Sequence, residues 1–444
     1  MNTGHHATRR PALQPHRRQG VAALTVVMIL FFVMAMVAAY TNRNLIFEQR
    51  ISTNSYRANR ALEAADAGVE WTVALLNGGR INANCQSSTT VTDTDFRRRY
   101  HTDAPANANG EGGYDVIWAD VSNNRVYPAC VNREGVLSCI CPAVGAAVPA
   151  IGGVADGLGS AFRVEFLRPG NAVRPGAMEF AARGCASVGD GAGACTSQTH
   201  DALPTVDGLS GALTTVGLVR ALPIPPIAAL TAGAAITGAT LGISNADPSN
   251  GLAVHAGGSA PAPSAGVVYS GPPGSTIVTW LPDDLALTQL RAEANNGWFR
   301  KMFGMDPATY QRQPAVRTCT DVCTSASLID IMAGYPRNPL WVAGNLNLDT
   351  AGALGSAADP VMLIVAGTLT ISANAVITGF VHADSVVWTA GATGASVRGA
   401  MVARDTFAAA GLATLDYDRA VLDLISLRYG SFVRAPGSWN LIFR

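Results

Sequence analysis

The chain has 444 residues and equal numbers of basic and acidic side chains, so its formal net charge is zero. That length allows two or three domains with an ample core. The zero balance leaves no basic surplus to neutralise phosphates, which argues against nucleic acid as a partner. The only lysine, Lys301, lies outside any glycine-rich loop, and this excludes the phosphate-binding loop that needs its own lysine.

The N-terminus reads as a membrane segment. The first twenty residues carry four arginines and no acidic residue, and the uncharged, mostly apolar run Val21–Tyr40 follows directly. As a helix this run is about 30 Å long, which matches the hydrocarbon core of a bilayer. The arginines before it should stay in the cytoplasm and direct the rest of the chain outward.

Two simpler interpretations compete: a cleaved secretory signal peptide, with Val37–Ala39 as its cleavage site, and a plain single-span anchor. The apolar part of a signal peptide is normally about 7–15 residues long, which is shorter than this run. The segment after the run argues against both, because Thr41–Asn77 contains no proline and a single glycine, Gly68.

Apolar residues recur in that segment at spacings of mostly three and four, as on one face of an amphipathic helix. They are Phe47, Ile51, Ala58, Leu62, Ala65, Val69, Val73 and Leu76. The pattern predicts that the membrane run continues into one helix of about 57 residues, since Gly78-Gly79 is the first helix-ending signal after it.

A basic leader that ends in glycine (Arg17–Gly20), an apolar run directly after it and the helical stretch Arg60–Gly68 together resemble the PilX N-terminal domain of type IV pilus assembly proteins. The resemblance implies that prepilin peptidase cuts between Gly20 and Val21. Major pilins carry glutamate at the fifth mature position, which is Thr25 here. PilX-like proteins and the tip pseudopilin of type II secretion often lack this carboxylate, so the departure argues against a major pilin only.

Eight cysteines, an even number, follow the membrane segment and indicate an oxidising compartment with disulfides. Cys185 and Cys195 enclose nine residues, three of them glycine, and are expected to pair. Cys319 and Cys323 are a weaker expectation, because so short a loop constrains the geometry. The other candidates, for which no pairing is assigned, are Cys85, Cys130, Cys139 and Cys141. No zinc-ligand spacing occurs, so neither a metal nor a cofactor is expected.

Beyond the helix, alternation predicts strands at Ala161–Leu167 and Ala177–Ala182, which resemble the antiparallel sheet that packs on a pilin helix. After residue 222 the sequence pattern changes to short apolar runs that are interrupted by glycine. Gly379–Gly391 aligns with Gly399–Gly411 at an offset of twenty, which is typical of stacked β-solenoid rungs. The alternative is an ordinary sandwich of short strands.

Similar repeat starts occur at Val342 and Val365. Between the glycine-rich blocks, Pro282–Phe303 is predicted to be a helix with Asp283 and Asp284 in its first turn. Its expected apolar contacts are Leu285, Leu290, Trp298, Phe299, Met302 and Phe303.

The sequence therefore predicts an α+β protein: a long N-terminal transmembrane and amphipathic pilin-like helix, an antiparallel β head region, and a glycine-rich, β-solenoid-like C-terminal region with a helical insertion. The expected boundaries are a prepilin leader at 1–20, the helix at 21–79, the β-rich head at 80–222, and the β-solenoid-like domain at 223–444 with its insertion at about 282–303.

Two common catalytic motifs are absent from the sequence: it contains neither a Gly-x-Ser-x-Gly elbow nor a His-Glu-x-x-His pair. Asp349, Asp359 and Asp384 are carboxylates of the glycine-rich region that no pattern brings together. The chain is therefore not expected to be an enzyme. A membrane-tethered, polysaccharide-acting β-solenoid enzyme is the alternative from a different class.

The resemblance implies a structural minor pilin that inserts in the inner membrane of a Gram-negative bacterium, is processed, helps to initiate a type IV pilus and ends at its tip. Its implied partners are prepilin peptidase and, through the N-terminal helix, the major pilin and other minor pilins. A tip pseudopilin of a type II secretion system is the closer alternative. The head supplies the exposed, adhesive surface in this interpretation, and the sequence assigns no ligand to it.

Overall fold

The computed structural model describes residues 20–103, 114–116, 127–143, 159–167, 176–186, 209–275, 278–320 and 322–442. The chain divides into two compact units, one ending at Arg57 and the other beginning at Ala58. All the described β structure lies in the second unit.

The first element, α1 (Gly20–Leu76), is a single helix of 57 residues, as the sequence predicted. Its continuity follows from the absence of proline and from the presence of just one internal glycine, Gly68. It ends where Gly78 and Gly79 follow, and the Gly78 N–H donates to the Leu75 carbonyl at 2.9 Å. In the first unit the described side chains of the helix are exposed from residue 22 to residue 56.

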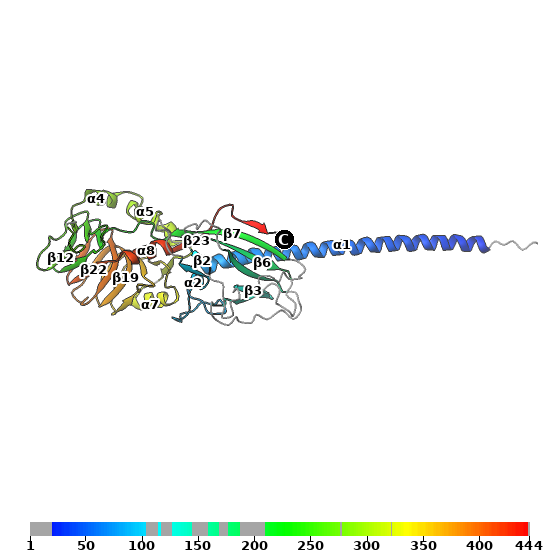
Figure 1. Cartoon of the computed structure of the whole chain (residues 1–444), viewed down its shortest axis with the longest axis horizontal. Helices are drawn as coiled ribbons and strands as arrows, with labels where there is room; N and C mark the ends of the chain where they lie inside the picture. Colours follow the sequence, from blue (N-terminus) through cyan, green and yellow to red (C-terminus); the bar gives the residue numbers. More distant parts are fainter. Residues whose placement is uncertain are drawn as a thin grey trace, which may run out of the picture. The chain divides into compact units, whose positions relative to one another are not determined.

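The second unit contains an antiparallel sheet, which we call the antiparallel region. Its strand order is β23-β7-β6-β5-β3-β4, with β24 also paired to β7 (Figure 1). The bounds are β3 Ala129–Arg133, β4 Val136–Ile140, β5 Ala161–Leu167, β6 Ala177–Cys185, β7 Leu209–Arg220, β23 Gly430–Arg434 and β24 Asn440–Ile442. The predicted strand at 161–167 is confirmed in full, and that at 177–182 runs three residues further.

The C-terminal part of α1 packs against this sheet through small residues. Ala61, Ala65 and Val69 are fully buried, whereas Ala58, which the periodicity placed on the buried face, is exposed. The buried face is rotated because the backbones approach closely: a Cβ built on Gly184 of β6 would lie 2.1 Å from the Ala61 carbonyl oxygen. Large side chains of the sheet, among them Phe162, Phe166 and Phe180, fill this core together with Leu76 of α1.

Between α1 and the sheet, α2 (Phe96–Tyr100) adds an aromatic contact, with its Phe96 ring 5.7 Å from that of Trp71. A separate antiparallel pair follows, β1 (His101–Asp103) with β2 (Tyr114–Val116).

The rest of the second unit is a 15-stranded sheet in which every recorded pairing is parallel; we call it the parallel region. Its strands are β8 Leu230–Ala232, β9 Ile236–Gly238, β10 Leu241–Ser244, β11 Val254–Ala256, β12 Val267–Ser270, β13 Trp280–Leu281, β14 Arg317–Cys319, β15 Leu340–Val342, β16 Leu346–Leu348, β17 Gly352–Leu354, β18 Val361–Ile371, β19 Ala375–Trp388, β20 Ser396–Ala403, β21 Phe407–Ala409 and β22 Ala413–Tyr417.

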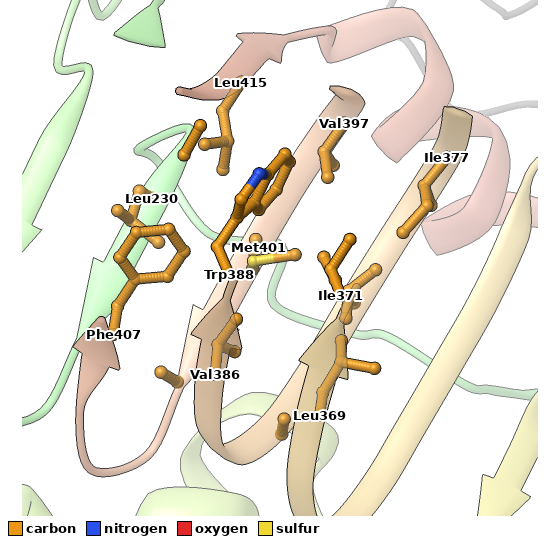
Figure 2. Packing of buried hydrophobic residues seen from close by; sticks show 14 of the residues in the cluster. Leu230, Leu369, Ile371, Ile377, Val386, Trp388, Val397, Met401, Phe407 and Leu415 are labelled. Atoms are coloured by element: carbon orange, nitrogen blue, oxygen red, sulfur yellow. The ribbon is translucent and has the colours of Figure 1, made fainter. Parts of the chain in front are cut away.

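The register of these strands follows the sequence repeat. Gly379 of β19 lies opposite Gly399 of β20, which is the offset of twenty, and Val342 of β15 lies opposite Val365 of β18. Stacked rungs require such parallel pairing between consecutive repeats. Inward-facing side chains of neighbouring strands meet in a shared apolar core, as Figure 2 shows for Trp388, among others.

The predicted single helix at 282–303 is wrong, because the structure has two. α4 (Leu285–Ala292) begins after Asp284, whose side chain accepts from the Ala286 N–H, and α5 (Gly297–Phe303) follows a break. Asn295 and Asn296 cause the break, since both have left-handed backbone angles, which asparagine tolerates.

Only some of the apolar residues expected to pack in this insertion are buried. Trp298, Phe299 and Phe303 are buried against the outer face of the parallel region, whereas Leu285 is exposed and was wrongly placed in the core. Three further helices complete the unit: α6 Pro307–Gln311, α7 Ser325–Gly334 and α8 Arg419–Arg428.

The last strands return to the antiparallel region. β23 and β24 both pair with β7, so the parallel region lies within the chain between two neighbouring strands of the antiparallel sheet. The sequence interpretation instead assigned everything from residue 223 to residue 444 to one β-solenoid-like domain. No local pattern could show that residues 430–442 belong with a strand that ends at residue 220.

Candidate functional site

The first part of α1 offers a long apolar surface. No charged residue occurs between Val21 and Asn42, and large side chains such as Phe31 and Phe32 are exposed. Among the described residues this is the one helix long and apolar enough to cross a membrane, by length and composition. The helix is compatible with membrane anchoring.

Polar groups within the apolar surface are satisfied by the helix itself. The Thr25 hydroxyl donates to the Ala22 carbonyl at 2.9 Å, and the Thr41 hydroxyl donates to the Val37 carbonyl at 2.9 Å. Such bonds to the preceding turn let a threonine enter an apolar environment without an intermolecular partner. The fifth position after the expected cleavage point therefore carries no unsatisfied polar group.

The expected cleavage point lies at the very start of α1. The helix begins at Gly20 and includes Val21, and the leader before Gly20 lies outside the described residues. Processing between Gly20 and Val21 stays a prediction.

The other end of α1 is held by a group of polar contacts that the sequence did not indicate. The Asn77 amide donates to the Phe432 carbonyl at 2.9 Å and accepts from the Phe432 N–H at 2.8 Å, so it pairs with β23 as a strand would. Arg97 donates to the Leu76 carbonyl at 2.6 Å, and Arg317 of β14 donates to the Asn77 carbonyl at 2.6 Å.

This arrangement places two guanidinium groups on carbonyls at the C-terminal end of α1, where the helix dipole favours positive charge. It also ties the helix to both β regions at one point. Asn77 before Gly78-Gly79 marked the end of the helix in the sequence, but its partners lie more than 230 residues away along the chain.

The structure joins six of the eight cysteines in described pairs: Cys85–Cys141, Cys130–Cys139 and Cys319–Cys323. The weaker expectation for Cys319 and Cys323 is therefore realised. Cys185 is disulfide-bonded, and its expected partner Cys195 lies outside the described residues. The first two pairs fasten the segment after α1 and the β3–β4 hairpin of the antiparallel region.

The three carboxylates considered for polysaccharide chemistry have separate surroundings. Asp349 accepts from the Ser325 hydroxyl, Asp359 accepts from Arg98 and Arg337, and Asp384 pairs with Arg404. No cluster of three or more histidine, cysteine or acidic side chains suited to a metal ion occurs within the described part of the chain.

Comparison with known proteins identifies the N-terminal segment. Residues 19–70 match the family described as PilX N-terminal, which confirms the resemblance drawn from the basic leader and the helix. No curated protein matches the chain. A crystal structure of the competence-associated pilin ComZ from Thermus thermophilus is similar at 12% identity, over 87% of this chain and 98% of that one, with a TM-score of 0.22, too low to support an argument about fold.

Proposed function

We propose, from the PilX N-terminal domain at residues 19–70, that this chain is a structural minor pilin of a type IV pilus. The observation that carries the proposal is the position of that domain on one 57-residue helix, with its first part exposed and apolar and its last part packed on an antiparallel sheet. Such a helix has two uses in succession: it holds the subunit in the inner membrane, and it then buries the same surface against the helices of other minor pilins and the major pilin.

Processing by prepilin peptidase between Gly20 and Val21 is the first step of the proposed path. Mass spectrometry of the mature protein tests it. We expect Val21 at the N-terminus, and a mature N-terminus at Tyr40 would instead mean a secretory signal peptide and contradict the pilin assignment. A Gly20→Ala substitution should leave the chain unprocessed in the membrane fraction. Ala58→Gly is the control, because Ala58 is an exposed residue of the same helix far from the cleavage point.

A position at the filament tip is the second part of the proposal. The head after the helix has roughly 370 residues, which implies a body about 50 Å across by compact-domain scaling. Packed helices lie about 8–10 Å apart, so neighbouring subunits along a shaft could not all carry such a head. Thr25 supports the same position, because its hydroxyl bonds within its own helix and needs no terminal amine from a neighbour.

Immunogold labelling of sheared pili tests the position, with an antibody to the major pilin as the control that decorates the whole shaft. Sparse label for this chain at one end is expected, and regular label along the shaft contradicts the tip position. A deletion strain separates the two related systems: loss of surface pili supports a pilus protein, whereas loss of protein secretion with normal pili supports a tip pseudopilin.

A further inference from the structure

An open groove of about 770 Å³ lies along β4, the last strand in the order of the antiparallel sheet. The strand lines the groove along its whole length, Val136–Ile140. The rest of the lining comes from Arg133 of β3, Trp71 of α1 and the segment 84–86. The groove therefore borders an edge strand, whose outward main-chain groups have no neighbouring strand to pair with.

The pairing of β4 with β3 shows which main-chain groups face outward. The Asn132 N–H donates away from β4, to the Ser160 carbonyl at 2.8 Å, so Asn132 and the opposite Leu137 form a non-hydrogen-bonded pair. Cys130 and Cys139 form the next such pair, and their Cα atoms lie 4.1 Å apart, as the short spacing of this kind of pair requires. The N–H and C=O groups of Leu137 and Cys139 therefore point away from β3.

These groups have no partner within the described part of the chain. Neither N–H donates to a described residue, and neither carbonyl accepts from one. Both residues line the groove, Leu137 is 47% exposed and Cys139 is half-buried, so an incoming chain can reach them. At the next outward position, the Cys141 N–H donates to the Ala83 carbonyl at 2.8 Å. The chain thus pairs with this edge at one position and leaves the two before it open.

The segment 82–86 cannot continue this pairing itself. Cys85 has a left-handed backbone angle, φ +60°, and its disulfide ties the turn to the end of β4. The Asn82 side chain accepts from the N–H groups of Asn84 and Gln86 at 2.9 and 3.0 Å, so the turn uses these donors. The open positions of β4 are therefore available to a strand from elsewhere.

The two ends of the sheet differ in how their main chain is satisfied. At the β23 end, the Asn77 amide donates to the Phe432 carbonyl and accepts from its N–H. β4 lacks the usual protection of an edge, since its sequence VLSCI contains no charge and no proline and its register with β3 is unbroken. An unprotected edge strand beside a groove is the arrangement that recognises extended peptides.

We propose that β4 binds an extended segment of a separate protein by strand addition. The main chain of that segment bonds with Leu137 and Cys139, which together offer two donors and two acceptors. Its side chain on the α1 side meets Trp71, so we expect an apolar residue at that position. Binding requires only the folded head, so this inference does not depend on the proposed function.

Random seven-residue peptides displayed on phage are the probe, selected on the full-length chain in detergent micelles after depletion on empty micelles. Enriched peptides are then synthesised, and their Kd is measured for three proteins. Leu137→Pro removes the outward N–H and leaves the bonds between β3 and β4 intact, so it should raise the Kd about tenfold or more. Leu137→Ala is the matched control, because it shortens the same side chain but keeps the N–H; its Kd should rise less than about threefold.

Hydrogen exchange supplies a readout that is independent of the substitutions. The amides of Leu137 and Cys139 should exchange about tenfold more slowly when the peptide is bound, because each then donates to the added strand. If Leu137→Pro does not fold, as thermal unfolding would show, Leu137→Lys takes its place, since an edge lysine opposes strand pairing.

Three results would overturn the proposal: no enriched peptide distinguishes Leu137→Pro from the wild type, Leu137→Ala loses as much affinity as Leu137→Pro, or the two amides exchange equally fast with and without peptide. Self-association of the chain that Leu137→Pro abolishes, measured by sedimentation, would make a second copy the occupant and contradict a separate protein. All variants should be processed normally at Gly20, and a defect there would concern the proposed function and not the groove.

Discussion

The antiparallel and parallel regions solve the same problem, the burial of apolar strands, in opposite ways. In the antiparallel region, consecutive strands pair from β5 to β7, and the sheet is completed by strands from a distant part of the chain: β7 pairs with β23, which begins more than 200 residues later. In the parallel region, β18, β19 and β20 follow one another, and their facing residues are about twenty apart in sequence. The earlier strands β8, β9 and β10 join this run through pairings with β20, β21 and β22. The antiparallel sheet is thus completed by one return of the chain, whereas the run β18–β20 is built by repeating the same short-range pairing.

Different contacts stabilise the two regions. Two disulfides and the Asn77 contacts hold the antiparallel region and its helix together. In the parallel region, successive backbones approach closely at the aligned glycines: a Cβ on Gly399 would lie 2.0 Å from the Gly379 carbonyl oxygen. Because the two regions rely on different contacts, they should respond differently to the same kind of change.

The largest effect is expected from Gly399→Ala in the parallel region. Its φ of +132° and its contact with a neighbouring backbone, which cannot move aside cheaply, combine strain and overpacking. The expected loss of unfolding free energy is about 4–5 kcal/mol. Hydrogen exchange of β19 and β20 peptides should rise sharply while that of β5 and β6 rises less.

Gly242→Ala is the matched control, because Gly242 lies in β10 of the same region and a Cβ there meets no atom within 4 Å. Its effect should stay within about 1 kcal/mol. Equal effects of the two substitutions would mean that the aligned glycines do not govern the stack.

The next effect concerns the antiparallel region. Replacing Cys85 and Cys141 by alanine opens a loop with a sequence separation of 56, for which chain entropy predicts a loss of about 4 kcal/mol. Removing Cys319–Cys323, with a separation of 4, should cost about 2 kcal/mol by the same relation. Differential scanning calorimetry compares them, and a larger loss for the short loop would contradict the contrast between the regions.

This contrast also explains what could be predicted from the sequence. The 57-residue helix needed only periodicity and the absence of breakers, and the repeat at Gly379 and Gly399 needed only short-range similarity, so both are visible along the chain. The return of β23 to β7 leaves no local trace, because antiparallel pairing depends on where the chain comes back.

The candidate sites also differ in whether the sequence could predict them. Thr25 and the cleavage point follow from a linear motif at the N-terminus. The groove beside β4 could not be predicted, because it exists only where α1 and residues 84–86 come beside the β3–β4 hairpin. The open main-chain groups of Leu137 and Cys139 depend on the register with β3, which residue types alone do not reveal.

The third prediction concerns pH and the outer face of the parallel region, where His382 of β19 is buried beside Phe299. Burial, and then the positive charge of Arg404, lower the pKa of His382 from 6.5 to about 3 on folding, so below pH 6.5 the unfolded chain binds a proton that the folded chain does not. The free energy of unfolding is therefore not reduced by this proton uptake above pH 6.5, and it falls progressively as the pH is lowered toward 3. Between pH 7 and pH 4 this amounts to about 3 kcal/mol.

Urea unfolding of the wild type and of His382→Phe at both pH values measures this effect. Between pH 7 and pH 4 the variant should lose about 3 kcal/mol less unfolding free energy than the wild type, because phenylalanine does not titrate. Subtracting the unfolding free energies of the two proteins cancels the contribution of the carboxyl groups that both contain. One of these is Asp95: burial raises its pKa, but the charges of Arg98 and Arg97 outweigh burial, so the pKa is lowered overall. Identical pH dependence of the two proteins would show that His382 is accessible to protons in the folded state.

The smallest effect comes from an ion pair that joins the regions. Arg98 of α2 donates to Asp359, just before β18, at 2.8 Å, and Arg337 donates to the same carboxylate at 3.0 Å. The Asp359 side chain is 21% exposed, so water screens the interaction only in part. A double-mutant cycle of Arg98→Met and Asp359→Asn should give a coupling energy of about 1 kcal/mol.

The equivalent cycle for Arg398 and Asp418 is the control within the parallel region, where the arginine side chain is 61% exposed and a coupling below about 0.5 kcal/mol is expected. The Arg98–Asp359 pair should also affect how the regions unfold, since it links α2 to the loop before β18 of the parallel region. Without it, calorimetry should show a broader transition, because the two regions then melt less cooperatively. A transition of unchanged width, together with a coupling energy near zero, would mean that other contacts hold the junction, such as that of Arg317 of β14 with the Asn77 carbonyl at the end of α1.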